Sequence, residues 1–135
     1  MFDKPKILII DDEDDIRDII RVKLEDKGFQ VEDASNGPEG IEKAAKFIPD
    51  IILLDVVMPK MDGVSVFFKL QENPLTKGIR TLFFTGKGDP QSIIVDANRR
   101  FAQQSGAFDF VRKEIDLDEL ARKLQSILED IKNKK

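Results

Sequence analysis

Four nearly continuous apolar segments run along the chain, and a polar residue follows each of them closely. These segments are Ile7–Ile10, Ile51–Leu54, Leu82–Phe84 and Ala107–Val111, the last interrupted by Asp109. Apolar runs without polar alternation are typical of strands that are buried on both faces of a parallel sheet. The pattern therefore predicts strands over Lys6–Ile10, Ile51–Leu54, Arg80–Phe84 and Phe108–Val111, with a further short strand over Phe29–Ala34.

Segments of helical periodicity separate these strands. They run from Asp14 to Lys27, from Pro38 to about Phe47, through Val64–Leu70, from Ile93 to Phe101 and from Leu117 to Ile131. Gly28 is expected to end the first helix, and Asp116 to cap the last one. Strands that alternate with helices predict an α/β fold, here one (βα)5 unit with five strands and five helices.

The composition limits the chemistry that the chain can perform. A length of 135 residues suits one domain, and a net charge of -4 does not favour general attraction to nucleic acid. Cysteine and histidine are absent, which excludes disulfides and thiolate or imidazole metal ligands, so any bound metal must be a hard cation held by oxygen. Neither a signal peptide nor a segment of membrane-spanning length is recognisable, and a cytoplasmic location is expected.

Three carboxylates follow the first and third predicted strands. Asp11 and Asp12 are adjacent, and such a pair is unfavourable unless a cation or water screens it. The acids from Asp11 to Asp15 are equally explained as the favourable first turn of a helix. Asp55 favours the cation over the helix turn as the explanation. A carboxylate directly after a buried strand is costly without a compensating charge, and Asp55 would lie beside Asp11 and Asp12 if the two strands are neighbours. The three acids together predict a Mg²⁺ site.

A hydroxyl and an ammonium follow the other two apolar segments. Taken alone, Thr85 is explained by the strand preference of threonine, and Lys113 by a solvated surface charge. Ligands of parallel sheets bind beyond the carboxyl ends of the strands, where both residues would meet the three acids. A hydroxyl and an ammonium are the groups needed to bind phosphoryl oxygens that a metal does not hold.

Together these residues make the chain similar to the receiver domain of two-component response regulators. The matching residues are Asp11-Asp12, Asp55, the run Met58–Gly63, Thr85-Gly86 and Phe110–Lys113. The resemblance covers nearly the whole chain in order. It implies a flavodoxin-like (βα)5 fold whose five-stranded parallel sheet has the order 2-1-3-4-5, with helices on both faces. It also implies one receiver domain over residues 1–135, with no output domain visible.

The resemblance assigns a phosphoryl acceptor and a metal site. Asp55 would accept a phosphoryl group from a phosphohistidine of a sensor histidine kinase or histidine phosphotransfer protein. Asp12 and Asp55 would ligate Mg²⁺ (or Mn²⁺), Asp11 would act mainly through water, and Val57 would contribute its backbone carbonyl. The chain would then be a signalling domain that catalyses only its own phosphotransfer and dephosphorylation.

The resemblance also assigns a response to phosphorylation. Thr85 and Lys113 would complete the catalytic set with Asp55 by binding the phosphoryl oxygens. Phe110 stands where the family has an aromatic switch residue, although a simple core position explains it equally well. A downstream protein target would bind the face made by the fourth helix, fifth strand and fifth helix. Dimerisation through that face is one alternative, and no direct contact with nucleic acid or membrane is expected.

Two features depart from the family pattern. Glu114 follows Lys113 where the family usually has proline, commonly after a cis bond, which a residue other than proline disfavours. The stretch from Thr85 to Lys113 is several residues longer than usual, so partner choice cannot be transferred from relatives.

Three other functions are alternatives to phosphorylation signalling, and the sequence disfavours each of them. A Mg²⁺-dependent phosphatase with an aspartyl nucleophile typically needs an acid two residues after it, where this chain has Val57. A flavin-binding protein of the same architecture would need a phosphate-binding first turn and an aromatic stacking residue, but the turn is acidic, and tyrosine and tryptophan are absent. A receiver-like module without phosphorylation is disfavoured by the intact set of five polar residues.

Overall fold

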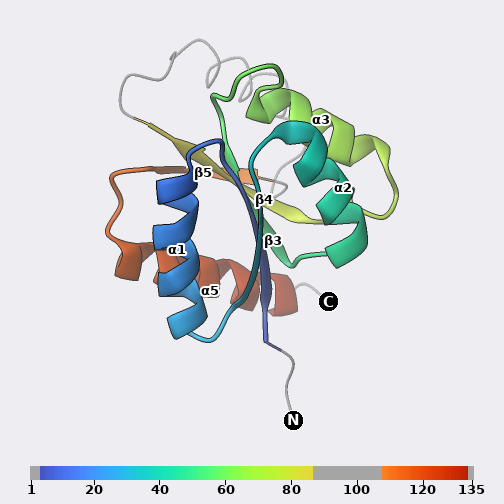
Figure 1. Ribbon diagram of the computed structural model, residues 1–135. Coiled ribbons are helices and arrows are strands. Elements are labelled where there is room, and N and C mark those ends of the chain that lie inside the picture. The colour runs from blue at the N-terminus through green and yellow to red at the C-terminus, as the bar shows by residue number, and fades with distance from the viewer. Residues whose placement is uncertain (1–3, 87–107, 134–135) are drawn as a thin grey trace.

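The computed structural model describes residues 4–86 and 108–133, and its secondary structure alternates as the sequence predicts (Figure 1). The strands are β1 (Lys6–Ile10), β2 (Gln30–Ala34), β3 (Ile51–Asp55), β4 (Arg80–Thr85) and β5 (Phe108–Arg112). The helices are α1 (Asp14–Asp26), α2 (Gly37–Phe47), α3 (Gly63–Glu72) and α5 (Leu117–Asn133). The helix predicted from Ile93 to Phe101 and the longer stretch that contains it lie outside the described residues.

The strands form one parallel sheet in the order β2-β1-β3-β4-β5, as predicted. Ile10 at the end of β1 is aligned with Leu54 of β3, and Asp55 at the end of β3 is aligned with Phe84 of β4. Thr85 ends β4 beside Arg112 of β5. This register brings the carboxyl ends of the strands, and the polar residues that follow them, to one edge of the sheet.

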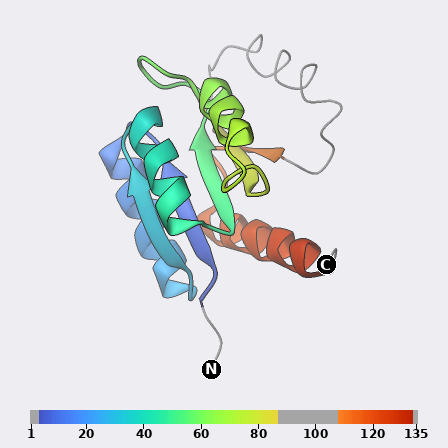
Figure 2. The same cartoon turned by 90° about the vertical axis from the view of Figure 1, so that its right-hand side faces the viewer.

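The sheet separates two hydrophobic clusters, and among the described residues a different pair of helices covers each of them (Figures 1 and 2). α1 and α5 pack against one face, where Ile9 and Leu53 are buried. α2 and α3 pack against the other, where Leu8 and Phe83 are buried. Successive side chains of a strand point to opposite faces, so an uninterrupted apolar run supplies both clusters at once.

Local polar residues fix where the helices begin and end. The Asn36 side chain accepts a hydrogen bond from the Glu39 N–H at the start of α2, and Asp62 accepts one from the Ser65 N–H at the start of α3. Asp116 accepts a hydrogen bond from the Asp118 N–H, which agrees with its predicted place at the start of α5. Gly28 follows α1 with a φ of +96°, a conformation that glycine adopts at little cost.

Within the described ranges, no helix combines the length and apolar character required to cross a membrane.

Candidate functional site

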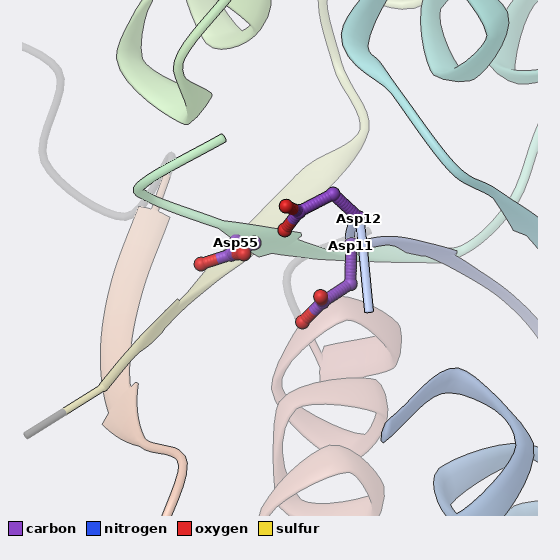
Figure 3. Close-up of side chains that lie close together, drawn as sticks. All are labelled: Asp11, Asp12 and Asp55. Carbon is purple, nitrogen blue, oxygen red and sulfur yellow. The ribbon is translucent and has the colours of Figure 1, made fainter. Parts of the chain in front are cut away.

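Three carboxylates converge at the carboxyl edge of the sheet (Figure 3). Asp11 and Asp12 follow β1, and Asp55 is the last residue of the neighbouring strand β3. One carboxylate oxygen of each lies within 4.8 Å of those of the other two. Asp11 and Asp55 are buried, whereas Asp12 is exposed to solvent. The structure thus brings together the three acids that the sequence predicts to be neighbours.

The ammonium group of Lys113 lies between the two buried carboxylates. Its Nζ is 3.3 Å from Asp11 Oδ2 and 3.2 Å from Asp55 Oδ2. The Lys113 backbone N–H donates to the Thr85 carbonyl at 2.7 Å, which extends the pairing of β4 and β5 and directs the lysine to the site. The peptide bond between Lys113 and Glu114 is trans, and Lys113 reaches the acids without a following proline.

Glu13 is a member of the site that the sequence did not single out. Its Oε1 accepts a hydrogen bond from Lys113 Nζ at 3.2 Å, although the Glu13 side chain is largely exposed. Glu13 precedes α1 and makes no side-chain cap for that helix. Its place in the acid run after Asp12 is the one signal in the sequence, and that signal does not distinguish it from the acids that follow.

The buried acids are held at an electrostatic cost. Burial, together with the nearby charge of Asp11, raises the pKa of Asp55 to about 7, although Lys113 and the Val57 N–H act in the opposite direction. Burial also raises the pKa of Asp11. Burial alone would lower the pKa of Lys113, but the charges of Asp11 and Asp55 outweigh it and raise that pKa above its usual value. The site therefore carries more negative charge than its ammonium compensates.

The oxygen atoms of this site fit a hard cation such as Mg²⁺. Asp11 Oδ1 accepts a hydrogen bond from the Glu13 N–H at 2.8 Å, and Asp55 Oδ1 accepts one from the Val57 N–H at 3.3 Å. The Oδ2 atoms of Asp11 and Asp55 are buried and receive no hydrogen bond of good geometry. Two such oxygens beside the exposed Asp12 offer carboxylate ligands while leaving room for water, which is how Mg²⁺ is usually bound.

Thr85 and Phe110 lie on the β4–β5 side of the site. Thr85 is buried, and its hydroxyl donates to the Val111 carbonyl at 3.4 Å. Phe110 is half-buried and stacks on Phe83, with ring centroids 5.2 Å apart. Phe110 thus makes a core contact here. Val57, two residues beyond Asp55, is partly exposed above the same edge of the sheet.

Comparisons with known proteins agree with this geometry. The family model of the response regulator receiver domain matches residues 7–125. The regulator RpaA of Synechocystis sp., described as a DNA-binding dual master transcriptional regulator, is 35% identical over 124 residues, which are 92% of this chain and 49% of that protein. The transcriptional regulatory protein SrrA of Staphylococcus aureus is 36% identical over 123 residues, or 91% of this chain and 47% of that protein. The chain thus spans about half the length of these relatives.

Solved structures show the same fold over almost the whole chain. The chemotaxis protein CheY4 of Vibrio cholerae has a TM-score of 0.79 at 28% identity, covering 93% of this chain and 99% of that one. A CheY-like receiver domain protein of Methanospirillum hungatei has a TM-score of 0.82 at 26% identity, covering 98% of this chain and 100% of that one. Fold, site and family model lead to one conclusion: the chain belongs to the response regulator receiver domain family.

Proposed function

We propose that this receiver domain, acting as one unit over residues 1–135, carries a signal through phosphorylation of Asp55. The observation that supports this most directly is the position of the Asp55 carboxylate. It is buried at the end of β3, 3.2 Å from the Lys113 ammonium and beside two further acids. A carboxylate is a weak nucleophile, so the reaction depends on positioning and on neutralising the charge of the phosphoryl group.

The proposed donor is a phosphohistidine on a sensor histidine kinase or a histidine phosphotransfer protein. An Asp55 carboxylate oxygen attacks the phosphorus, and the phosphorus–nitrogen bond of the donor breaks. The electron pair of that bond stays on the imidazole nitrogen, which takes a proton from water. The product is an acyl phosphate, and its hydrolysis returns the Asp55 carboxylate and ends the signal. The domain catalyses this reaction on itself and processes no separate substrate.

We assign the cation site to Asp11, Asp12, Asp55 and the backbone carbonyl of Val57. Two buried carboxylate oxygens support this assignment, because they receive no hydrogen bond of good geometry and share one ammonium as their counterion. A bound Mg²⁺ (or Mn²⁺) would supply positive charge to the phosphoryl oxygens and keep Asp55 ionised. Lys113 neutralises the remaining charge, and its ammonium already lies within reach of Asp55.

The response begins, in this proposal, at Thr85. Its hydroxyl would leave the Val111 carbonyl to donate to a phosphoryl oxygen on Asp55, and the end of β4 would follow. Phe110 would repack beside it. We place the binding surface for a downstream protein on β5 and α5; the fourth helix that the sequence predicts for this surface lies outside the described residues. Residues 1–135 carry a net charge of -4, and we assign them no nucleic-acid contact of their own and a cytoplasmic location.

Phosphorylation at Asp55 is testable by intact-mass analysis. Incubation with acetyl phosphate and Mg²⁺ is expected to add one phosphoryl group to the wild-type chain and none to Asp55→Asn. The amide lacks the anionic oxygen that attacks phosphorus, so the loss should be complete. Reduction of the acyl phosphate with borohydride, followed by peptide mapping, should locate the modification at Asp55.

Asp15→Asn serves as the matched control, because Asp15 is an exposed acid of the same N-terminal run. This variant should be phosphorylated like the wild type. A phosphoryl group that persists in Asp55→Asn would show that another residue is the acceptor.

Binding of Mg²⁺ is expected to depend on Asp12. Asp12→Ala removes the exposed carboxylate and should abolish the weak binding that calorimetric titration detects in the wild type. Binding also stabilises the fold, by about 1.4 kcal/mol when the Mg²⁺ concentration is ten times Kd, and this gain in thermal unfolding should disappear as well. Asp15→Ala has the same change of charge and should still bind the ion; equal affinity in Asp12→Ala and wild type would contradict the assigned site.

A further inference from the structure

The backbone after β1 departs from strand geometry to form the cation site. Successive side chains of a strand point to opposite faces of the sheet. Asp11 and Asp12 are successive residues, yet each places a carboxylate oxygen within 4.8 Å of one on Asp55 (Figure 3). The chain achieves this with a bend at Asp12, directly after the end of β1. The β1–β2 ladder does not continue past this bend, so contacts outside the ladder must hold the bend in place.

The peptide group between Asp11 and Asp12 is held from one side by Arg17. The Asp11 N–H still donates to the Ala34 carbonyl at 3.1 Å, as in the ladder between β1 and β2. In a continued parallel ladder, the Asp11 carbonyl would accept from the N–H of Asn36. Asn36 is instead the N-cap residue of α2 and lies beyond the end of β2 at Ala34. Arg17 Nη1 takes its place and donates to the Asp11 carbonyl at 2.6 Å.

Arg17 is itself fixed in position. Its side chain is mostly buried, with 12% of its surface exposed. Its Nη2 donates to Asp14 in the first turn of α1, and its Nε lies 3.5 Å from Asp33 Oδ2 on β2. The guanidinium group therefore joins three elements: the loop after β1, the start of α1 and the edge strand β2. Its planar arrangement of donors suits it to hold a carbonyl and two carboxylates at once.

We infer that Arg17 is a positioning residue for the cation site. It orients the peptide between Asp11 and Asp12 so that both carboxylates face Asp55, and it contacts neither the ion nor the phosphoryl group. The inference rests on the proposed function, because it names a residue that acts through the assigned metal ligands. Outer residues that orient metal ligands commonly affect metal affinity by roughly 10-fold to 100-fold.

The sign of the effect separates positioning from simple electrostatics. Arg17 is positively charged and lies close to the acids, so its charge alone opposes the binding of a cation. If charge were its whole contribution, removing it would tighten Mg²⁺ binding. If it positions Asp11 and Asp12, removing it weakens binding, because the bend is no longer held.

The experiment compares Arg17→Met with Arg21→Met by calorimetric titration of Mg²⁺ into the chain. Arg21 is a matched control one turn further along α1. It also pairs with Asp33, at 3.1 Å, but it donates to the Val31 carbonyl instead of that of Asp11. We expect Arg17→Met to bind Mg²⁺ roughly 10-fold more weakly than the wild type. We expect Arg21→Met to bind at least as tightly as the wild type.

Circular dichroism first establishes that each variant is folded. If Arg17→Met does not fold, Arg17→Lys decides instead. It retains the charge but not the planar set of donors, and it should bind Mg²⁺ less tightly than the wild type. Unchanged or tighter binding in the Arg17 variants would overturn the inference, as would equal weakening in Arg21→Met. A wild-type chain that binds no Mg²⁺ would instead overturn the assigned metal site, and the inference with it.

Discussion

Replacing Gly63 by alanine is expected to destabilise the folded chain by about 3 kcal/mol or more, which is a large part of the stability of an ordinary domain. Gly63 begins α3, and its N–H donates to the Val56 carbonyl at 2.8 Å. A Cβ atom at this position would lie 2.2 Å from the carbonyl oxygen of Asp55 and 3.0 Å from the Cα of Val56. These are backbone atoms, which cannot rotate away, so the junction of β3 and α3 must move.

Urea unfolding followed by far-UV circular dichroism measures this loss. Gly78→Ala is the control, because nothing lies within 4 Å of a Cβ at that exposed position, and its stability should change by no more than about 1 kcal/mol. Gly40→Ala provides an intermediate case, since its Cβ would meet side-chain atoms of Ile10, which have more freedom to adjust. Wild-type stability in Gly63→Ala would show that the junction tolerates displacement. A folded Gly63→Ala should still lose Mg²⁺ affinity, because the displaced atoms belong to Asp55.

Replacing Lys113 by methionine is expected to cost about 3 kcal/mol near pH 8 in the presence of a chelator. The ammonium lies 3.3 Å from Asp11 Oδ2 and 3.2 Å from Asp55 Oδ2, and both of these carboxylates are buried. Methionine keeps the apolar stem of the side chain but leaves the two acids without their shared cation. Removing one partner of a buried ion pair is costly because the remaining charge has neither water nor a counterion.

This cost should grow with pH. The pKa of Asp55 is raised to about 7 in the folded chain, against 3.8 for a free aspartate. Between about pH 4 and pH 7 the folded chain therefore binds more protons than the unfolded chain, and its stability falls as the pH rises. Lys113 lowers the pKa of Asp55, so the loss of Lys113 raises that pKa further. The pH range over which the stability of the folded chain falls then extends to higher pH. The difference between Lys113→Met and wild type should be small near pH 4 and largest above about pH 7.

Urea unfolding at several pH values measures this dependence. The double variant Lys113→Met/Asp55→Asn should be more stable near pH 8 than Lys113→Met alone, because one of the two uncompensated charges is gone. A loss in Lys113→Met that is the same at every pH would contradict this account, since it would mean that the charge of Lys113 does not contribute.

The sequence predicts β1, β3 and β4 well because each of these strands is buried on both faces. β1 has the predicted bounds, and β3, β4 and β5 begin where the apolar runs predict. β3, β4 and β5 each extend one residue further, through Asp55, Thr85 and Arg112, because backbone pairing does not depend on the polarity of the side chain. β2 begins one residue later than predicted, since the Phe29 N–H donates to the Leu24 carbonyl at the end of α1. The apolar pattern therefore predicts which segments are buried strands, whereas backbone hydrogen bonds determine the residue at which each strand begins or ends.

The candidate site was predictable to the extent that its residues end strands. Asp11, Asp55 and Lys113 follow apolar runs, and the topology of a parallel sheet brings them together. Glu13 and Arg17 were not predicted as members. Both are charged residues near or within a helix rich in charge, and their roles depend on side-chain directions that periodicity does not specify. Thr85 was predicted as a member, but the hydrogen bond from its hydroxyl to the Val111 carbonyl was not, because it also depends on the direction of the side chain.

The division of the core by the sheet determines which helices would sense a movement at Thr85. Thr85 and Phe83 are two residues apart on β4 and therefore point to the same face. Phe83 and Phe110 belong to the cluster beneath α2 and α3, whereas Phe84 belongs to the cluster beneath α1 and α5. A displacement that starts at Thr85 thus meets one layer of side chains directly and reaches the other only through the backbone of the sheet. A change at α5 therefore depends on how far the backbone of β4 and β5 moves, whereas the layer of α2 and α3 meets the moving side chains themselves.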